Sequence, residues 1–243
     1  MVFARRIEGQ ELTFGVSGKL IMNAVVLYDH QTETLWSQFL AEGVEGPLTG
    51  VRLELLPSQL TTWAAWTAQH PDTLLLDRGF SLFRNDRYEG YYVSGRAGIL
   101  GEQNRDDRLP TKELVIGLRH GSDVIAYAYR DLAGIRVLNH AYDGEPIVVT
   151  FDPDSKAPAV FDRTVDGQTL TFEHAEQGEP GDGTTMRDAQ TGSLWSAAQG
   201  VALDGPLEGV QLAQLPSFVS FWFAWSDFYP RTTVYQPGNT PGA

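Results

Sequence analysis

The phrase DHQTETLWSQ, at residues 29–38, returns late in the chain as DAQTGSLWSA, at residues 188–197. Placing Asp29 on Asp188 fixes a constant shift between the two occurrences. The same shift pairs all six tryptophans of the chain, which indicates an internal duplication. The pairs are Trp36 with Trp195, Trp63 with Trp222, and Trp66 with Trp225.

The repeat extends well beyond this phrase. EGPLTGVRLELLPS aligns with DGPLEGVQLAQLPS, and VFARRIEGQELTF aligns with VFDRTVDGQTLTF after a shift smaller by one residue. We therefore predict the order Y1–X–Y2, in which X and Y2 form one packed unit. The predicted boundaries are residues 1–76 for module Y1, 77–112 for a polar spacer, 113–158 for module X and 159–237 for module Y2.

Short apolar runs and turn signals predict a mainly β fold with a few short helices. RRIEGQELTF is typical of a hairpin, and LIMNAVVLYD is an apolar run of strand length. Module X adds a hairpin in ELVIGLRHGSDVIAYAY and a strand in EPIVVTFD. PSQLTTWAAWTAQHP predicts a short helix with Ser58 as its N-cap and Pro71 as its end.

The repeated phrase allows a catalytic and an architectural interpretation. A short acceptor followed by hydroxyl side chains, as at Asp29, Thr32 and Thr34, is how a turn satisfies its own backbone amides. Occurrence in both copies favours architecture over a shared catalytic role. We therefore expect the two Y modules to superimpose, with Trp36 over Trp195 and Trp63 over Trp222, all largely buried.

Composition narrows the class of protein. A hydrophobic share of 42% with 20% charged residues is typical of a globular domain. The net charge of −13 argues against nucleic acid and an anionic membrane as partners. There are no cysteines, so disulfides and thiolate metal sites are excluded.

The chain shows no signal peptide and no apolar stretch of about 18 residues that would span a membrane. As written it is expected to be cytoplasmic. An extracytoplasmic location is the alternative if the true start lies upstream of Met1.

Several phrases resemble the domain-of-unknown-function family 3179 over nearly the whole chain: LTFGVSGKL, YDHQTETLWSQ, GPLTG, FWFAWSDFYP and VIAYAY with PIVVTFDP and VFDR. The resemblance implies an X–Y–X–Y organisation whose first X module is absent here. Met1 would fall inside the closing strand of that module, so either the gene start is misplaced or this member dispenses with it. In the family the first X module carries a Cys-Pro-x-Cys stretch, which suggests a metal or redox site. Asp152 and Ser155 stand at the corresponding positions of the retained X module.

Candidates for metal binding and acid–base chemistry are weak. Asp152 and Asp154 could offer oxygen ligands to a cation, but DPDSKA departs from the calcium-loop pattern, and the alternative is a polar turn. The five histidines lack metal-ligand spacing. His140 is the best of them as an acid–base group, against a capping or solvated histidine. We predict no cofactor and no stoichiometric transition metal.

Ligand-binding candidates come from the region where the copies differ. Residues 15–28 predict a packed strand with Asn23 buried in it, whereas residues 173–187 predict a mobile acidic loop. Ser17, Asn23 and Asp29 are therefore the leading polar group for binding a ligand, with His140 as a further candidate.

The sequence does not assign a function. A non-catalytic, duplicated β-rich module for ligand binding or interaction is favoured because no catalytic motif is complete. The alternative is a metal-assisted enzyme whose site needs the missing N-terminal module or a second subunit, so enzymatic activity remains an open question.

Association is predicted from the two matched helices. Residues 58–69 have a polar side, as a surface helix does, whereas residues 217–228 are apolar nearly all round. We expect module X to cover the second helix and the uncovered apolar surface of Y1 to form an isologous homodimer.

Overall fold

The computed structural model describes residues 1–76, 88–120, 123–176 and 184–238. It confirms a β-rich fold with short helices, since most regular elements are antiparallel strands. The helices of the described residues are α1 (Trp63–Gln69), α2 (Glu89–Val93), α3 (Tyr129–Ile135) and α4 (Trp222–Phe228).

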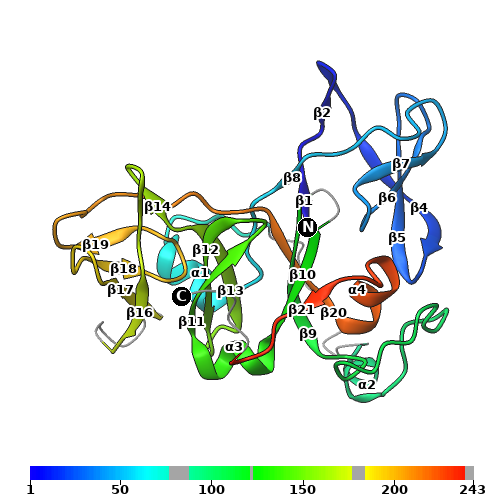
Figure 1. Ribbon diagram of the computed structural model, residues 1–243. Helices are drawn as coiled ribbons and strands as arrows, with labels where there is room; N and C mark the ends of the chain where they lie inside the picture. Colours follow the sequence, from blue (N-terminus) through cyan, green and yellow to red (C-terminus); the bar gives the residue numbers. More distant parts are fainter. Residues whose placement is uncertain (77–87, 121–122, 177–183, 239–243) are drawn as a thin grey trace.

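Modules Y1 and Y2 contain the same succession of sheets (Figure 1). Each has a two-stranded hairpin followed by a four-stranded antiparallel sheet whose strands lie in sequence order. In Y1 these are β2 (Arg6–Ile7), β3 (Gln10–Glu11), β4 (Phe14–Ile21), β5 (Ala24–Asp29), β6 (Leu35–Ser37) and β7 (Glu42–Glu45). In Y2 they are β14 (Thr164–Val165), β15 (Gln168–Thr169), β16 (Phe172–Ala175), β17 (Thr185–Asp188), β18 (Leu194–Ser196) and β19 (Ala202–Asp204). That the two modules arose by duplication stays a prediction.

Two sheets lie between these modules (Figure 1). One has the order β20-β9-β10-β21 and the other the order β11-β12-β13. Their strands are β9 (Leu114–His120), β10 (Asp123–Ala128), β20 (Ser217–Phe221), β21 (Thr233–Val234), β11 (Val137–Tyr142), β12 (Glu145–Asp152) and β13 (Ala157–Asp162). A short pair, β1 (Val2–Phe3) with β8 (Leu55–Leu56), leads from Y1 towards them.

The repeated tryptophans Trp36 and Trp195 anchor the two four-stranded sheets. Both are 0% exposed. Trp36 meets Phe14 edge to face at 5.9 Å between ring centroids, and Trp195 meets Phe172 in the same way at 5.6 Å. Aromatic pairs of this geometry add to the stability gained from burial alone. The same residue pair therefore holds the core of each module.

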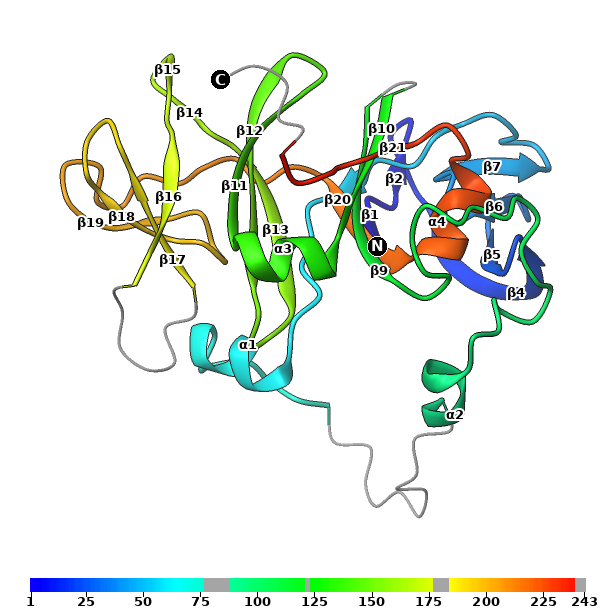
Figure 2. The ribbon, with the colours of Figure 1, turned by 60° about the horizontal axis from the view of Figure 1, so that its bottom comes forward.

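The end of each Y module packs on the other half of the molecule (Figure 2). Phe228 of α4 stacks on Phe39 of Y1 at 4.6 Å, and the Tyr229 hydroxyl donates to the Phe39 carbonyl at 2.5 Å. In the other direction, the Gln59 amide, just before α1, donates to the Ala198 carbonyl of Y2. The end segments of Y1 and Y2 therefore each contact the opposite half of the chain.

Helix α1 differs from the sequence prediction. It begins at Trp63 with Thr62 as N-cap, whose hydroxyl accepts from the Ala65 amide at 3.3 Å. Ser58 is not the cap, because residues 57–62 run without helical structure. The prediction that Trp63 is largely buried is wrong, since its exposed fraction is 53%. In Y2 the matched stretch begins as strand β20 rather than as helix, because its backbone pairs with β9.

The contrast predicted between residues 15–28 and 173–187 holds for β5, which is a packed strand, but is wrong for Asn23 and for the strands at 172–175 and 185–188. Asn23 lies in the β4–β5 turn, with φ of 67°, rather than inside a strand, and β4 is largely solvent-exposed. Conversely, β16 and β17 are formed strands, and Met186 of β17 is fully buried. Backbone pairing within the sheet outweighs the low strand propensity of the neighbouring glycines and acids. Residues 177–183 lie outside the described part.

Candidate ligand-binding site

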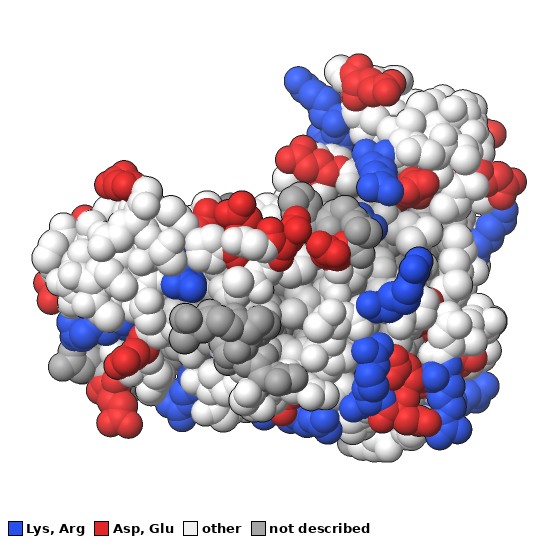
Figure 3. Space-filling model, viewed as in Figure 1, with Lys and Arg blue, Asp and Glu red and all other residues white. Residues whose placement is uncertain are grey.

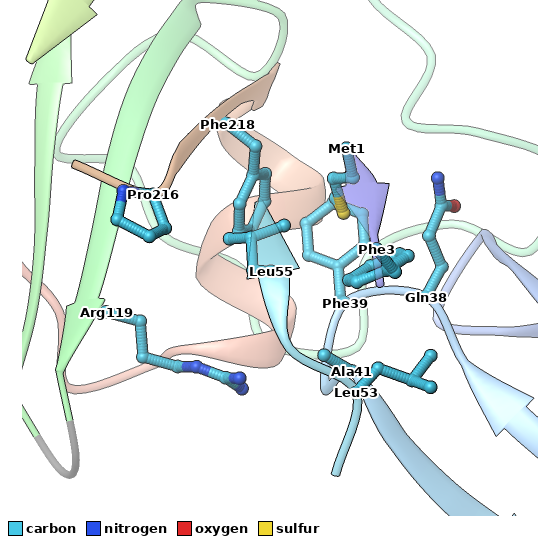
Figure 4. Close-up of a pocket in the computed structure, with 10 residues that line it drawn as sticks. All are labelled: Met1, Phe3, Gln38, Phe39, Ala41, Leu53, Leu55, Arg119, Pro216 and Phe218. Atoms are coloured by element: carbon cyan, nitrogen blue, oxygen red, sulfur yellow. The ribbon is translucent and has the colours of Figure 1, made fainter. Parts of the chain in front are cut away.

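A cavity of about 210 Å³ opens where module Y1 meets the sheet of β9 and β20 (Figure 4). Most of its lining residues are apolar in type, and they come from segments far apart in the sequence. The lining residues are Met1, Phe3, Gln38, Phe39, Ala41, Leu53, Leu55, Arg119, Pro216 and Phe218. The cavity exists because the Y2 arm that carries Phe218 lies against the 38–41 turn of Y1.

Arg119 is the one charged side chain among these lining residues. It projects from β9, and its Nη1 donates to the Leu40 carbonyl at 2.9 Å and reaches the Tyr229 hydroxyl at 3.5 Å. Both contacts use Nη1, which leaves Nε and Nη2 without a partner in the described residues. A guanidinium presents a fork of donors that suits a carboxylate.

The charge of Arg119 meets no opposite charge in the described part of the chain. No carboxylate of the described residues forms an ion pair with it. Burial raises the pKa of Tyr229, and the opposing effect of the Arg119 guanidinium does not overcome it, so the phenol stays neutral at pH 7. Among the described residues, the cavity therefore combines a cation that has no ion-pair partner with mostly apolar lining residues.

The chain matches, over residues 1–232, the family described as Protein of unknown function (DUF3179). The chain belongs to this family. No curated protein and no solved structure matches it. Within the described residues, no helix is both long and apolar enough to cross a membrane.

The polar group predicted from the sequence is not brought together. The Asn23 amide donates to the Gly101 carbonyl at 2.8 Å, and its oxygen accepts from the Leu100 amide at 2.7 Å. Ser17 donates to the Val26 carbonyl at 2.6 Å. Asn23 thus fastens the spacer to the β4–β5 turn, and each candidate is engaged in a different place.

Asp29 is buried inside its own turn, as Asp188 is in Y2. The Asp29 carboxylate accepts from Trp36 Nε1 at 3.0 Å and from the Thr32 hydroxyl at 2.7 Å. Asp188 accepts from the matched indole at 2.9 Å and the matched hydroxyl at 2.8 Å. Burial by itself raises the pKa of both carboxyls, but the hydrogen bonds outweigh it and leave each pKa below its usual value.

His140 of β11 lies in the central core, 7% exposed. Its Nδ1 is 2.8 Å from the Tyr127 hydroxyl, and its ring contacts the rings of Tyr127 and Tyr235, which also contact each other. Burial lowers the pKa of His140, so the imidazole is neutral at pH 7. The ring is thus part of a packed aromatic cluster rather than a lining of the cavity.

The weak metal candidates lie in a turn after β12. The Asp152 carboxylate accepts from the Ser155 hydroxyl at 2.5 Å and from the Thr184 hydroxyl at 3.2 Å. Asp154 is exposed, and its backbone amide lies 3.4 Å from Asp152 Oδ1. Within the described ranges, no three imidazole or carboxylate groups gather around one point.

Sequence reasoning missed Arg119. The available signal was its position in LVIGLRH, where it is the one charged residue of an otherwise apolar strand apart from the terminal histidine. A charge inside an apolar run usually has a structural or functional partner. What the sequence could not supply was the neighbour of this strand, the 38–41 turn of Y1.

Proposed function

We propose that this protein is a non-catalytic binding module that holds a small carboxylate with an apolar body in the Arg119 cavity. The observation that carries the proposal is the unpaired guanidinium of Arg119 facing walls made by Phe39 and Phe218. A few convergent polar groups in an apolar pocket are typical of ligand sites.

The volume of the cavity and the charge of Arg119 limit the class of ligand that can bind. A dry cavity of about 150 Å³ suffices for benzene, so about 210 Å³ accommodates a six-membered ring or branched chain bearing one carboxylate. The apolar walls lower the local dielectric and strengthen an ion pair with Arg119. Gln38 also lines the cavity, at the end away from Arg119 in Figure 4, and its amide can donate to a polar substituent on the far side of the ligand.

The lining favours binding over catalysis. Among the side chains that line it there is no histidine, carboxylate, serine or other group that could act as base or nucleophile. A nucleic-acid ligand is not supported either. On the face shown in Figure 3, Lys and Arg side chains are interleaved with Asp and Glu instead of forming one basic patch.

Calorimetric titration with benzoate, and with the neutral isostere benzamide, tests the proposal. We expect benzoate to bind with a Kd on the order of 0.1 to 1 mM and benzamide at least tenfold more weakly, because only benzoate pairs with Arg119. Arg119→Gln should abolish the preference, and Arg119→Lys should retain part of it because the charge remains.

Arg52→Gln is the matched control, since Arg52 is exposed and its ion pair with Glu42 lies on the surface. This variant should bind benzoate as the wild type does. Equal affinity for the acid and the amide, or a preference that survives Arg119→Gln, would contradict the proposal. Unfolding temperatures of all variants show whether loss of the Leu40 contact has disturbed the fold.

A further inference from the structure

The part of the cavity that Gln38 lines has a counterpart in module Y2. Gln38 matches Ala197, because each directly follows a Leu-Trp-Ser sequence of the repeated phrase. The two backbones are also held alike. The Gln38 amide donates to the Val25 carbonyl at 3.3 Å, and the Ala197 amide donates to the matched Thr184 carbonyl at 3.0 Å. The carbonyls of Gln38 and Ala197 therefore occupy equivalent places in the two modules.

Met1, which also lines the cavity, has a counterpart in Y2 as well. Strand β1 of Y1 corresponds to the end of β13. Phe3 of β1 pairs with β8 in the same register in which Phe161 of β13 pairs with Gln214. Met1 lies two residues before Phe3, and its counterpart is therefore Ala159, two residues before Phe161.

In Y2 a hydroxyl group of module X lies between these two positions. Thr150 of β12 is 1% exposed and pairs with Ala159, and its hydroxyl donates to the Ala197 carbonyl at 2.6 Å. In Y1, β8 is the one partner of β1 among the described residues, so no strand lies on the other side of Met1. No donor in the described part of the chain bonds to the Gln38 carbonyl. The place that Thr150 fills in Y2 thus adjoins the cavity in Y1.

We propose that the ligand of the Arg119 cavity is a hydroxy acid whose hydroxyl group donates to the main-chain carbonyl of Gln38, as Thr150 donates in Y2. This assignment rests on the proposed function, because it requires the ligand carboxylate to pair with Arg119. Met1 and Gln38 lie together at the end of the cavity away from Arg119 (Figure 4). The hydroxyl and the carboxylate therefore belong at opposite ends of an apolar body, as in 4-hydroxybenzoate.

Calorimetric titration with benzoate and its substituted forms tests this inference. The net contribution of one hydrogen bond predicts that 4-hydroxybenzoate binds about three- to tenfold more tightly than benzoate. 4-Methoxybenzoate should lose this gain, because its ether oxygen cannot donate a hydrogen bond. 2-Hydroxybenzoate should lose it too, because its hydroxyl lies beside its own carboxylate. Equal affinity for benzoate and 4-hydroxybenzoate would overturn the inference.

The variant Gln38→Ala separates the main-chain carbonyl from the side-chain amide of the same residue. It removes the amide, and Ala197 at the matched position shows that this turn accepts alanine. The variant should still prefer 4-hydroxybenzoate over benzoate by about threefold or more, because the main-chain carbonyl remains. Loss of the preference in this variant would overturn the inference, since the side chain would then be the group that recognises the hydroxyl.

One NMR signal reports on the carbonyl directly. Gln38 is the one glutamine of the chain that is followed by phenylalanine, so carbonyl-¹³C glutamine combined with ¹⁵N-phenylalanine labels a single peptide bond. 4-Hydroxybenzoate should move this ¹³C signal downfield, as a hydrogen bond to a carbonyl does, and benzoate should move it less. If benzoate binds through Arg119 but the hydroxyl adds neither affinity nor a shift, this inference is wrong and the proposed function stands. If neither acid binds, both are wrong.

Discussion

In α4 the Trp225 indole donates to the Thr232 hydroxyl at 3.0 Å, and in α1 the Trp66 indole donates to the Thr73 hydroxyl at 2.9 Å. A backbone amide closes the C-terminal end of each helix in the same way. The Tyr229 amide donates to the Trp225 carbonyl at 2.9 Å, and the His70 amide donates to the Trp66 carbonyl at 2.8 Å. The two helices therefore share their local geometry, as their similar sequences predict.

Their surroundings are opposite. Trp225 is 0% exposed, whereas Trp66 is 38% exposed. The difference comes from β9, which pairs with β20 and places Gly117 against the outer edge of the Trp225 ring. No such strand covers α1 in the described part of the chain. Local sequence thus determines the helix and its caps, whereas burial of the tryptophan depends on an element brought in by the tertiary fold.

The largest expected effect comes from truncating the two matched tryptophans. Trp225→Ala should lower the free energy of unfolding by about 3 to 5 kcal/mol, because it leaves a large hole in a packed core. Trp66→Ala should change it by less than about 1 kcal/mol, as surface substitutions do. Urea unfolding at 1 µM measures both, and similar losses in the two variants would break the comparison.

The next largest loss of stability should come from adding a side chain at Gly117. Gly117→Val places atoms where the Trp225 ring lies, and overpacking of this kind costs about 3 kcal/mol. Gly134→Ala in α3 is the control, because a Cβ there meets nothing within 4 Å. It should leave stability unchanged or raise it by up to about 1 kcal/mol. If Gly117→Val unfolds at the wild-type temperature, the account of how α4 is covered is wrong.

Substitution of either buried carboxylate should lower the free energy of unfolding by the same amount. This result would separate the effect of packing a strand on a helix from any general difference in stability between the two modules. Asp29→Asn and Asp188→Asn each replace an acceptor of an indole and a hydroxyl hydrogen bond, so each should cost about 2 kcal/mol. Because the pKa of each carboxyl is lower in the folded chain, this stabilisation is present above about pH 4, the unfolded value, and is lost on further acidification. Denaturant melts at pH 7 and pH 3 test the pair, and a loss confined to one module would show that the turns are not equivalent.

The smallest expected effect on stability comes from His140, which lies in module X. The folded chain disfavours protonation because burial lowers the pKa of this histidine. Stability should therefore be fully present above about pH 6.5 and decrease as the pH falls below that value. His140→Gln should remove this slope between pH 7 and pH 5, whereas His30→Gln, at an exposed position, should keep it. If the slope of stability against pH is unchanged in His140→Gln, groups other than His140 cause it.

The sequence predicted the β-rich class, the repeated tryptophan turn and the existence of both helices, because these depend on patterns within some ten residues. The predictions of a buried Trp63 and of a helix at 217–221 were wrong, because both features depend on whether β9 lies alongside. The sequence also missed the Arg119 cavity, whose walls come from chain positions as distant as Phe39 and Phe218. Such long-range neighbours leave no periodic signal in a single sequence.

The central claim is that α1 and α4 share their local geometry and differ in cover, because β9 packs against α4 and no strand of the described residues packs against α1. The six indole N–H signals in a ¹⁵N-resolved spectrum, recorded with and without a soluble paramagnetic gadolinium chelate, test it most directly. We expect the Trp63 and Trp66 signals, assigned by single substitution, to lose intensity when the chelate is added, because both side chains contact solvent. The signals of Trp36, Trp195, Trp222 and Trp225 should remain unchanged throughout. Full intensity at Trp63 and Trp66 in the presence of the chelate, or equal losses at the four buried indoles, would contradict the account.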